Sequence, residues 1–151
     1  MSNRSRGSGR HGQRGAVAVE FALLLPLLLL LVFGTIQYGM YFWAMQGGSD
    51  VARTAARRAA VGDPATCADF QRAVRADIDS LTGSGATATV TRGYEMAMPS
   101  AVQVGDIVTV TVRFTSFDMQ LPFLPFVHEG TITSTVKTRV DFVPQQPETC
   151  S

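Results

Sequence analysis

One carboxylate lies inside an otherwise apolar run, and its position gives it a chemical role. Across residues 16–45, 24 of 30 residues are apolar and Glu20 is the only charged one. A carboxylate about 7 Å inside the start of a membrane helix costs less than the roughly 2.5 to 3.5 kcal/mol of a mid-membrane charge, but it still requires a partner. One interpretation is a glutamate at the lipid headgroups, favoured there by the positive end of the helix dipole.

A second interpretation of Glu20 is a partner on another chain. Hydrolysis of the peptide bond between Gly15 and Ala16 would leave a free, positively charged amine on Ala16. In a low dielectric that amine would neutralise Glu20 of a neighbouring helix and fix the stagger between two subunits.

Cys67 and Cys150 are the only two cysteines. In an oxidising compartment a disulfide between them closes a loop of about 84 residues, which stabilises a fold by up to about 4.5 kcal/mol in the entropic description. Free thiols are the alternative, whereas two isolated cysteines lack the paired spacing of a zinc site. We expect the disulfide, which would tether the C-terminal tail to the rest of the domain.

The groups needed for catalysis are sparse. His128 is the only histidine after Gly15, and the sequence contains no Gly-x-Ser-x-Gly elbow, P-loop, metal-ligand cluster or EF-hand. The basic leader, with Arg4, Arg6, Arg10 and Arg14, lacks the aromatic residues on which single-stranded nucleic acids stack. The sequence therefore predicts no enzyme, no cofactor, no metal, no small-molecule substrate and no nucleic-acid partner.

The apolar run predicts one transmembrane helix. As a helix, residues 16–36 rise about 31 Å, which matches the ~30 Å hydrocarbon core of a bilayer. Pro26 removes the hydrogen bond to the Ala22 carbonyl and predicts a kink. An aromatic cluster follows and is expected at the boundary between membrane and water; it comprises Tyr38, Tyr41, Phe42 and Trp43.

The distribution of arginines predicts the orientation of this helix. Four arginines precede it and Arg14 adjoins it, whereas the first arginine beyond it is Arg53. The positive-inside rule then puts the N-terminus in the cytoplasm and the C-terminal domain outside. A cleaved secretory signal is the alternative, but the run exceeds the usual 7 to 15 residues and no small-x-small cleavage site follows it.

The sequence of residues 14–26, RGAVAVEFALLLP, is followed by a leucine run, Gly34 and the Tyr/Phe cluster. Over residues 14–60 it resembles the TadE-like and TadG-like proteins, which are pseudopilins or minor pilins of the tight adherence (Tad) pilus. The resemblance implies that a prepilin peptidase cleaves between Gly15 and Ala16, and that Glu20 and Phe21 guide processing and subunit register. It also implies the bacterial inner membrane as location, with other Tad pilins and the pilus assembly platform as partners.

Beyond the membrane, the composition predicts a small α+β domain. Helix formers follow the aromatic cluster up to Gly62, Asp63 and Pro64, which end the helix. We expect a leader over residues 1–15, a transmembrane helix over 16–45, its continuation over 46–62 and the outer domain over 63–151. Thr66 and Asp69 form a capping box for a second helix to position 81, with an apolar face made of Phe70, Val74, Ile78 and Leu81.

The rest of the domain predicts a small antiparallel sheet. Strands are expected over residues 87–92, 107–117 and 131–142. In the middle strand, alternation puts Val108, Val110, Val112 and Phe114 on one face. The connection over residues 121–127 is unusually apolar, and is either core cover or an exposed surface for subunits, membrane or an adhesive target.

These expectations combine into a pilin-like α+β protein with a long N-terminal helix, a second short helix and about three strands. The function that fits them is a structural minor pilin or pseudopilin, supporting pilus assembly, adhesion or secretion. The alternative is an unprocessed single-pass membrane anchor that presents an envelope binding or scaffold domain. An intact Arg-rich leader on the protein from native membranes would indicate the alternative.

Overall fold

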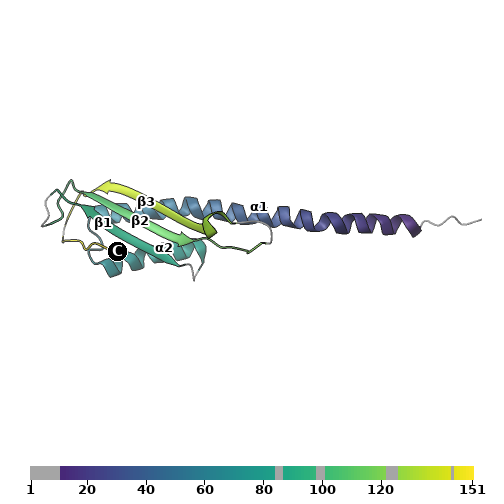
Figure 1. Ribbon diagram of the computed structural model, residues 1–151. Coiled ribbons are helices and arrows are strands. Elements are labelled where there is room, and N and C mark those ends of the chain that lie inside the picture. Colours follow the sequence, from purple (N-terminus) through teal and green to yellow (C-terminus); the bar gives the residue numbers. More distant parts are fainter. Residues whose placement is uncertain (1–10, 84–86, 98–100, 122–125, 144) are drawn as a thin grey trace, which may run out of the picture. The chain divides into compact units, whose positions relative to one another are not determined.

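The structure, a computed structural model, describes residues 11–83, 87–97, 101–121, 126–143 and 145–151. Figure 1 shows the elements in chain order: α1 (His11–Ala60), α2 (Cys67–Thr82), β1 (Ala88–Glu95), β2 (Ile107–Thr115), the 3₁₀ helix η1 (Val127–Gly130) and β3 (Thr131–Arg139). The long apolar helix, the short second helix and the three-stranded antiparallel sheet confirm the α+β pilin-like arrangement.

The chain divides into two compact units, Met1–Ile36 and Gln37–Ser151. The described part of the first unit consists only of helix, the N-terminal portion of α1. Most of its large apolar side chains are exposed, including Phe21 and the leucines of the run other than the partly buried Leu30. The helix continues through Pro26 without interruption. The kink at Pro26 stays a prediction.

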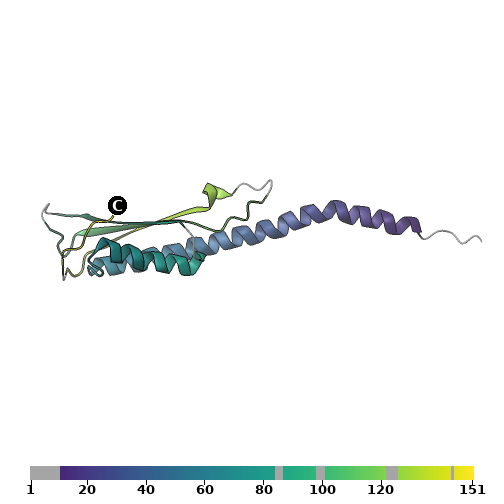
Figure 2. The same ribbon diagram turned by 90° about the horizontal axis from the view of Figure 1, so that it is seen from below.

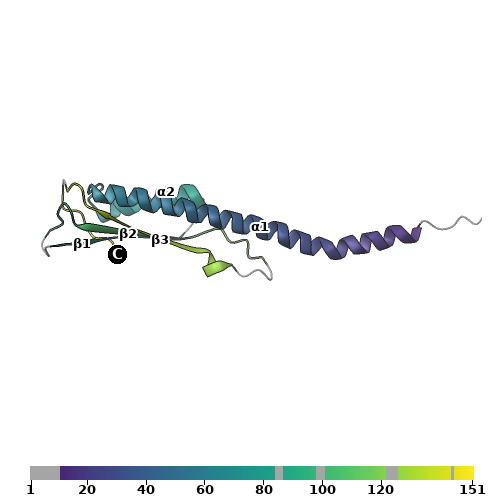
Figure 3. The same cartoon turned by 90° about the horizontal axis from the view of Figure 1, so that it is seen from above.

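The second unit has two layers. Figure 2 shows α2 and the portion of α1 that belongs to this unit side by side beneath one face of the sheet, and Figure 3 shows the same layers from the opposite side. The helices contribute alanines from α1 and an apolar stripe from α2, namely Ala52, Ala55, Ala56, Ala59, Phe70, Val74 and Ile78. In this set α1 contributes only small side chains, while the larger side chains come from α2.

The sheet is an antiparallel meander in the order β1-β2-β3. Val90 of β1 lies opposite Val112 of β2, and Phe114 of β2 lies opposite Ile132 of β3. The expected alternation of β2 is confirmed, because Val108, Val110, Val112 and Phe114 are all buried. On the outer face, the hydroxyls of Thr111 and Thr135 lie 3.0 Å apart and share a hydrogen bond.

Two glycines explain how closely α1 packs in this unit. A Cβ atom on Gly47 would lie 2.7 Å from Leu81 Cδ2, and one on Gly48 would lie 2.5 Å from Phe114 Cε1. Glycine weakens a helix interior by roughly 1 kcal/mol relative to alanine, so its presence here reflects the space that these two side chains occupy. Gly39 of the same helix has no such neighbour within 4 Å among the described residues.

Helix α1 ends two residues earlier than expected, at Ala60. Gly62 has φ 65°, the Gly62 N–H donates to the Ala59 carbonyl, and the Asp63 N–H donates to the Arg58 carbonyl. This pair of bonds is a Schellman motif, which requires a left-handed residue where Gly62 lies. The glycine signal therefore identified the helix end, although the last helical residue precedes it by two.

The expected capping pair of Thr66 and Asp69 forms at the start of α2, and the second of its two hydrogen bonds joins the two side chains. The Asp69 N–H donates to Thr66 Oγ1 at 3.3 Å, and the Thr66 hydroxyl donates to Asp69 Oδ2 at 2.7 Å. The hydroxyl bond to Thr66 and the charge of Arg72 lower the pKa of the Asp69 carboxyl. The expected apolar face is present, with Phe70, Val74 and Ile78 buried and Leu81 partly buried.

The strands differ from their expected limits at the ends. β1 runs three residues beyond position 92, to Glu95, whereas β2 and β3 stop at Thr115 and Arg139, short of the expected ends.

The aromatic cluster that follows the apolar run contains both buried and exposed rings. Tyr41 is buried and Tyr38 partly buried, and both rings make edge contacts with Phe126 at centroid distances of 5.5 and 6.3 Å. Tyr41 therefore packs inside the domain, while the expected place of the cluster at the membrane boundary stays a prediction.

Candidate functional site

The predicted processing site lies at the start of α1. Gly15, Ala16 and Glu20 are helical and exposed. Within the described part of the chain, no residue forms a hydrogen bond or an ion pair with the Glu20 carboxylate. The adjacent Phe21 side chain is also exposed. This arrangement leaves the carboxylate and the apolar surface beside it available to a lipid or to another chain.

The remaining leader residues, 1–10, lie outside the described residues, as do positions 122–125 of the apolar connection. At the ends of that connection, Leu121 and Phe126 are partly buried. Phe126 packs against the core through Tyr38 and Tyr41. Core cover is therefore the observed role at Phe126, while the choice between cover and exposed surface for 122–125 stays untested. The side chain of His128 also lies outside the described part.

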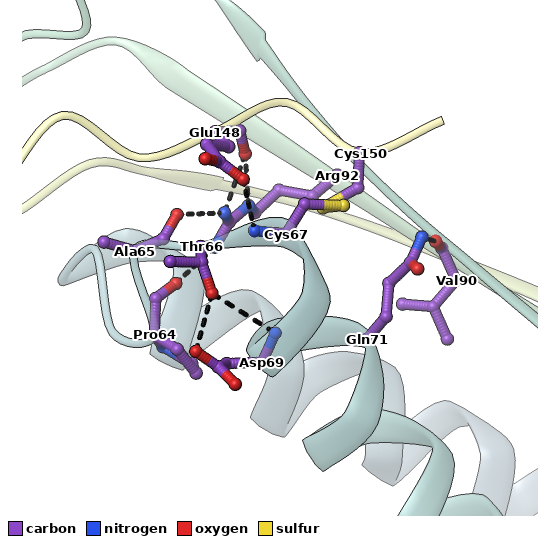
Figure 4. The surroundings of a disulfide bond; sticks show 10 residues. All are labelled: Pro64, Ala65, Thr66, Cys67, Asp69, Gln71, Val90, Arg92, Glu148 and Cys150. Atoms are coloured by element: carbon purple, nitrogen blue, oxygen red, sulfur yellow. Dashed lines mark hydrogen bonds between the residues drawn. A yellow bond between two sulfur atoms is a disulfide. The ribbon is translucent and has the colours of Figure 1, made fainter.

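The two cysteines are joined. Cys67 at the start of α2 and Cys150 in the C-terminal tail form the expected disulfide, with their Cα atoms 5.4 Å apart. Cys150 also pairs with Arg92 of β1 as an isolated antiparallel bridge. The tail therefore runs along the free side of β1 and connects that strand to α2 (Figure 4).

Glu148 adds polar contacts to the same region. Its carboxylate Oε2 accepts a hydrogen bond from the Cys67 N–H at 2.7 Å, and its own N–H donates to the Ala65 carbonyl at 2.9 Å. Cys67 is the first residue of α2, where an N–H has no partner inside the helix and a negative charge is favoured by the helix dipole. We call residues 146–150, with their partners on α2 and β1, the C-terminal clasp.

Arg92 lies at the centre of the C-terminal clasp and was missed by the sequence analysis. It is fully buried, and its guanidinium donates to the carbonyl oxygens of Pro64 (2.7 Å), Ala65 (2.8 Å) and Glu148 (2.7 and 2.9 Å). Figure 4 shows these carbonyls converging on the guanidinium from the two chain segments. One side chain thus connects β1, the segment before α2 and the tail.

The electrostatics of Arg92 follow from its burial. Desolvation lowers the pKa of the guanidinium, while the charges of Tyr94 and Glu148 raise it. The guanidinium carbon also lies 4.4 Å from the centroid of the Phe70 ring, a cation–π distance. A signal for Arg92 did exist in the sequence, because Arg92 is two residues from Val90 and strand alternation puts both on the inner face.

The contacts of the C-terminal clasp attach the tail to β1 and to the start of α2. Within the described residues, no group of three or more His, Cys, Asp and Glu side chains is arranged to hold a metal ion. The described part of the chain also contains one helix, Gly15–Ala60, that is long and apolar enough to cross a membrane, with a mean hydropathy of 2.7 in its most apolar window. The chain therefore presents an N-terminal apolar helix suited to a single membrane anchor. It also presents a domain whose tail is held by the disulfide, by the backbone bridge to Arg92 and by the hydrogen bonds of Glu148.

Comparison with known protein families gives one match, which lies within α1. Residues 15–57 match the family described as TadE-like protein. The match begins at the glycine of the predicted processing site and ends within α1. No curated protein and no solved structure matches the chain.

Proposed function

Since residues 15–57 are a TadE-like protein family domain, we propose that the protein is a minor pilin or pseudopilin of a Tad-type pilus system, anchored in the bacterial inner membrane by α1. The observation that carries this proposal is the coincidence of the family match with a helix that exposes Glu20 and Phe21 just after Gly15. The role is structural: the protein supports assembly of the fibre and is a substrate, not a catalyst, of its processing.

The proposed processing removes residues 1–15 and leaves Ala16 as the first residue. The new amine then lies within reach of a Glu20 on a neighbouring helix, and the pair is strengthened by the low dielectric of the membrane. Removing either partner from a buried ion pair leaves an uncompensated charge, which costs about 3–5 kcal/mol. Glu20 therefore acts through subunit register, with Phe21 beside it as an apolar contact.

The proposed topology leaves the leader in the cytoplasm and residues 63–151 outside. Residues 16–45 cross or border the membrane, and residues 46–62 continue the helix into the outer domain. The disulfide between Cys67 and Cys150 supports the outer location, because disulfides persist in extracytoplasmic compartments and are rare in the cytosol. The proposed partners are the prepilin peptidase, other Tad pilins and the assembly platform.

The direct test is the intact mass and N-terminal peptide of the full protein from its native membranes. A chain that begins at Ala16 is the expected result. A chain that retains Arg4, Arg6, Arg10 and Arg14 would overturn the processing proposal and favour the unprocessed anchor that presents a binding or scaffold domain.

A Glu20→Ala variant tests the assembly role separately. We expect it to be folded and membrane-bound but defective in pilus assembly, whereas Glu129→Ala, which removes an exposed carboxylate from η1, leaves assembly unchanged. Normal assembly by Glu20→Ala would show that Glu20 is an ordinary headgroup-level glutamate.

A further inference from the structure

The Gln37–Ser151 unit contains an apolar groove that its core does not fill. The groove has a volume of about 330 Å³ and is formed by three segments distant in sequence: one face of α1, the end of α2 and the residues after β2. Its lining is Met40, Trp43, Ala44, Leu81, Thr82, Ser116 and Phe117. Two aromatic side chains at its sides are more than half exposed, Trp43 at 57% and Phe117 at 60%.

The contacts around Phe117 fix the segment that carries it. The Ser116 N–H donates to the Gly130 carbonyl at 2.9 Å. On the other side, the buried Gln37 side chain donates through Nε2 to Asp118 Oδ1 at 3.1 Å. Both neighbours of Phe117 are therefore bonded to described parts of the unit, Ser116 through its backbone and Asp118 through its side chain. The exposure of the Phe117 ring is thus set by the tertiary structure.

The helix residues of the groove follow directly on the proposed membrane span. Met40 and Trp43 come four and seven residues after Ile36, within the same helix. At 1.5 Å per residue these positions are about 6 and 10 Å beyond the end of the span. The headgroup region adds roughly 5 to 8 Å to each side of the hydrocarbon core, so this part of α1 coincides with the headgroups and their outer edge.

The chemistry of the lining suits that depth. Among the described residues, the lining of the groove has aromatic and thioether side chains, two hydroxyls and no ionisable side chain. Tryptophan in particular is enriched where a membrane meets water, because its ring is apolar and its N–H seeks a polar partner. The neighbouring Phe42 of α1 is also 52% exposed.

We propose that this groove docks the outer domain onto the phospholipid surface of the bilayer that α1 spans, with the side chains of Trp43 and Phe117 directed into the headgroups. The inference rests on the membrane anchoring in the proposed function and adds a second, peripheral attachment made by the globular domain. Phe117 is the decisive residue, since its place beside Trp43 depends on the fold and not on its position in the sequence.

Trp43 is the only tryptophan, so the full chain carries a built-in depth probe. The protein is reconstituted in phosphatidylcholine and phosphatidylglycerol vesicles that contain lipid brominated near the carbonyl end of one acyl chain. We expect Trp43 emission to be blue-shifted and quenched. In a Trp43→Phe background, the test variant is Phe117→Trp and the matched control is Phe142→Trp, because Phe142 is equally exposed at 60% but follows the far end of α1, where its N–H donates to the Ala60 carbonyl.

The inference predicts quenching of Phe117→Trp and none of Phe142→Trp. A third variant, Leu28→Trp in the same background, reports the anchor through lipid brominated near the bilayer centre. Quenching of Leu28→Trp without quenching of Phe117→Trp would overturn the docking inference and leave the anchor intact. No quenching of Leu28→Trp would overturn the anchor itself. Protection of Phe117→Trp from both bromolipid and an aqueous quencher would assign the groove to a second copy of the chain and overturn the inference.

Discussion

Arg92 and Cys150 exchange both of their backbone hydrogen bonds, from the Arg92 N–H to the Cys150 carbonyl at 3.0 Å and from the Cys150 N–H to the Arg92 carbonyl at 2.7 Å. Their side chains then diverge to different partners. Cys150 is bonded to Cys67, and Arg92 reaches the carbonyls of Pro64 and Ala65 just before it. The backbone bridge thus joins two residues that are attached independently to the start of α2, Cys150 from the tail and Arg92 from β1.

Removal of the disulfide should release the tail while the sheet stays folded. We expect Cys150→Ser to lower the free energy of unfolding by about 2–4 kcal/mol, since the constraint on the unfolded chain is lost. Amide exchange should accelerate at Arg92 and at the tail, but not at Val110 in the central strand. Equal losses in Cys67→Ser and in the double variant are the internal control, and a loss of protection at Val110 would show that the sheet itself depends on the disulfide.

Replacement of Arg92 by lysine should be costly although the charge is kept. A single ammonium group does not span the carbonyls of Pro64, Ala65 and Glu148, so buried acceptors lose their donors. We expect Arg92→Lys to lower the unfolding free energy by about 2–4 kcal/mol in denaturant titration of the detergent-solubilised chain.

The matched control for Arg92 is Arg113→Lys, an exposed arginine on the adjacent strand β2. Its effect should stay within about 0.5 kcal/mol, as for most surface substitutions. Equal effects of the two substitutions would refute the central role assigned to Arg92.

Addition of one methyl group at Gly48 should destabilise the domain. The new Cβ would meet the buried ring of Phe114, which has no flexible end to move away. Overpacking of this kind costs about 1–3 kcal/mol, more than the ~1 kcal/mol that alanine gains in a helix.

The control for Gly48→Ala is Gly39→Ala in the same helix, where nothing lies within 4 Å among the described residues. Thermal unfolding should show a lower Tm for Gly48→Ala and an equal or higher Tm for Gly39→Ala. A higher Tm for both would mean that helix propensity, and not packing against Phe114, decides at position 48.

Tyr94 should make the fold sensitive to alkaline pH. Burial raises the pKa of its phenol above the ordinary 10.0, and the nearby Arg92 opposes that rise. The neutral phenol is therefore favoured in the folded state, and its contribution to stability is present below pH 10.0 and is lost as pH rises through the folded pKa.

Tyr94→Phe should remove this alkaline loss in a series of unfolding titrations across pH 8 to 12. Among the described residues the buried Tyr94 hydroxyl has no hydrogen-bond partner, so the same variant should match or slightly exceed the original stability at neutral pH. A marked destabilisation at neutral pH would show that the hydroxyl does have a partner in solution.

Local patterns in the sequence were sufficient for most of the elements. The Thr66 cap, the stripe of Phe70, Val74 and Ile78, and the alternation of β2 depend on neighbours a few residues apart, so chain order alone specifies them. The resemblance over residues 14–60 agrees with the family match over residues 15–57 for the same reason, since the motif is contiguous.

Contacts between residues far apart in the sequence determined the positions of the aromatic side chains. Tyr41 is an interfacial aromatic by its position in the sequence, but Phe126, 85 residues later, packs against it and draws it into the core. Phe117 gains its place beside Trp43 in the same way, through the bonds of Gln37 and Gly130 to its flanking residues.

Arg92 depends both on a local sequence pattern and on long-range contacts. Its position on the inner face of a strand was readable from alternation with Val90, but a buried arginine is stable only where donors meet acceptors. Those acceptors are the carbonyls of Pro64, Ala65 and Glu148, which lie 28, 27 and 56 residues away and converge only in the folded chain. The sequence by itself determined the long apolar helix, the second helix and the strands. The tertiary structure alone decided which polar and aromatic groups they would bury, because burial depends on partners that chain order does not reveal.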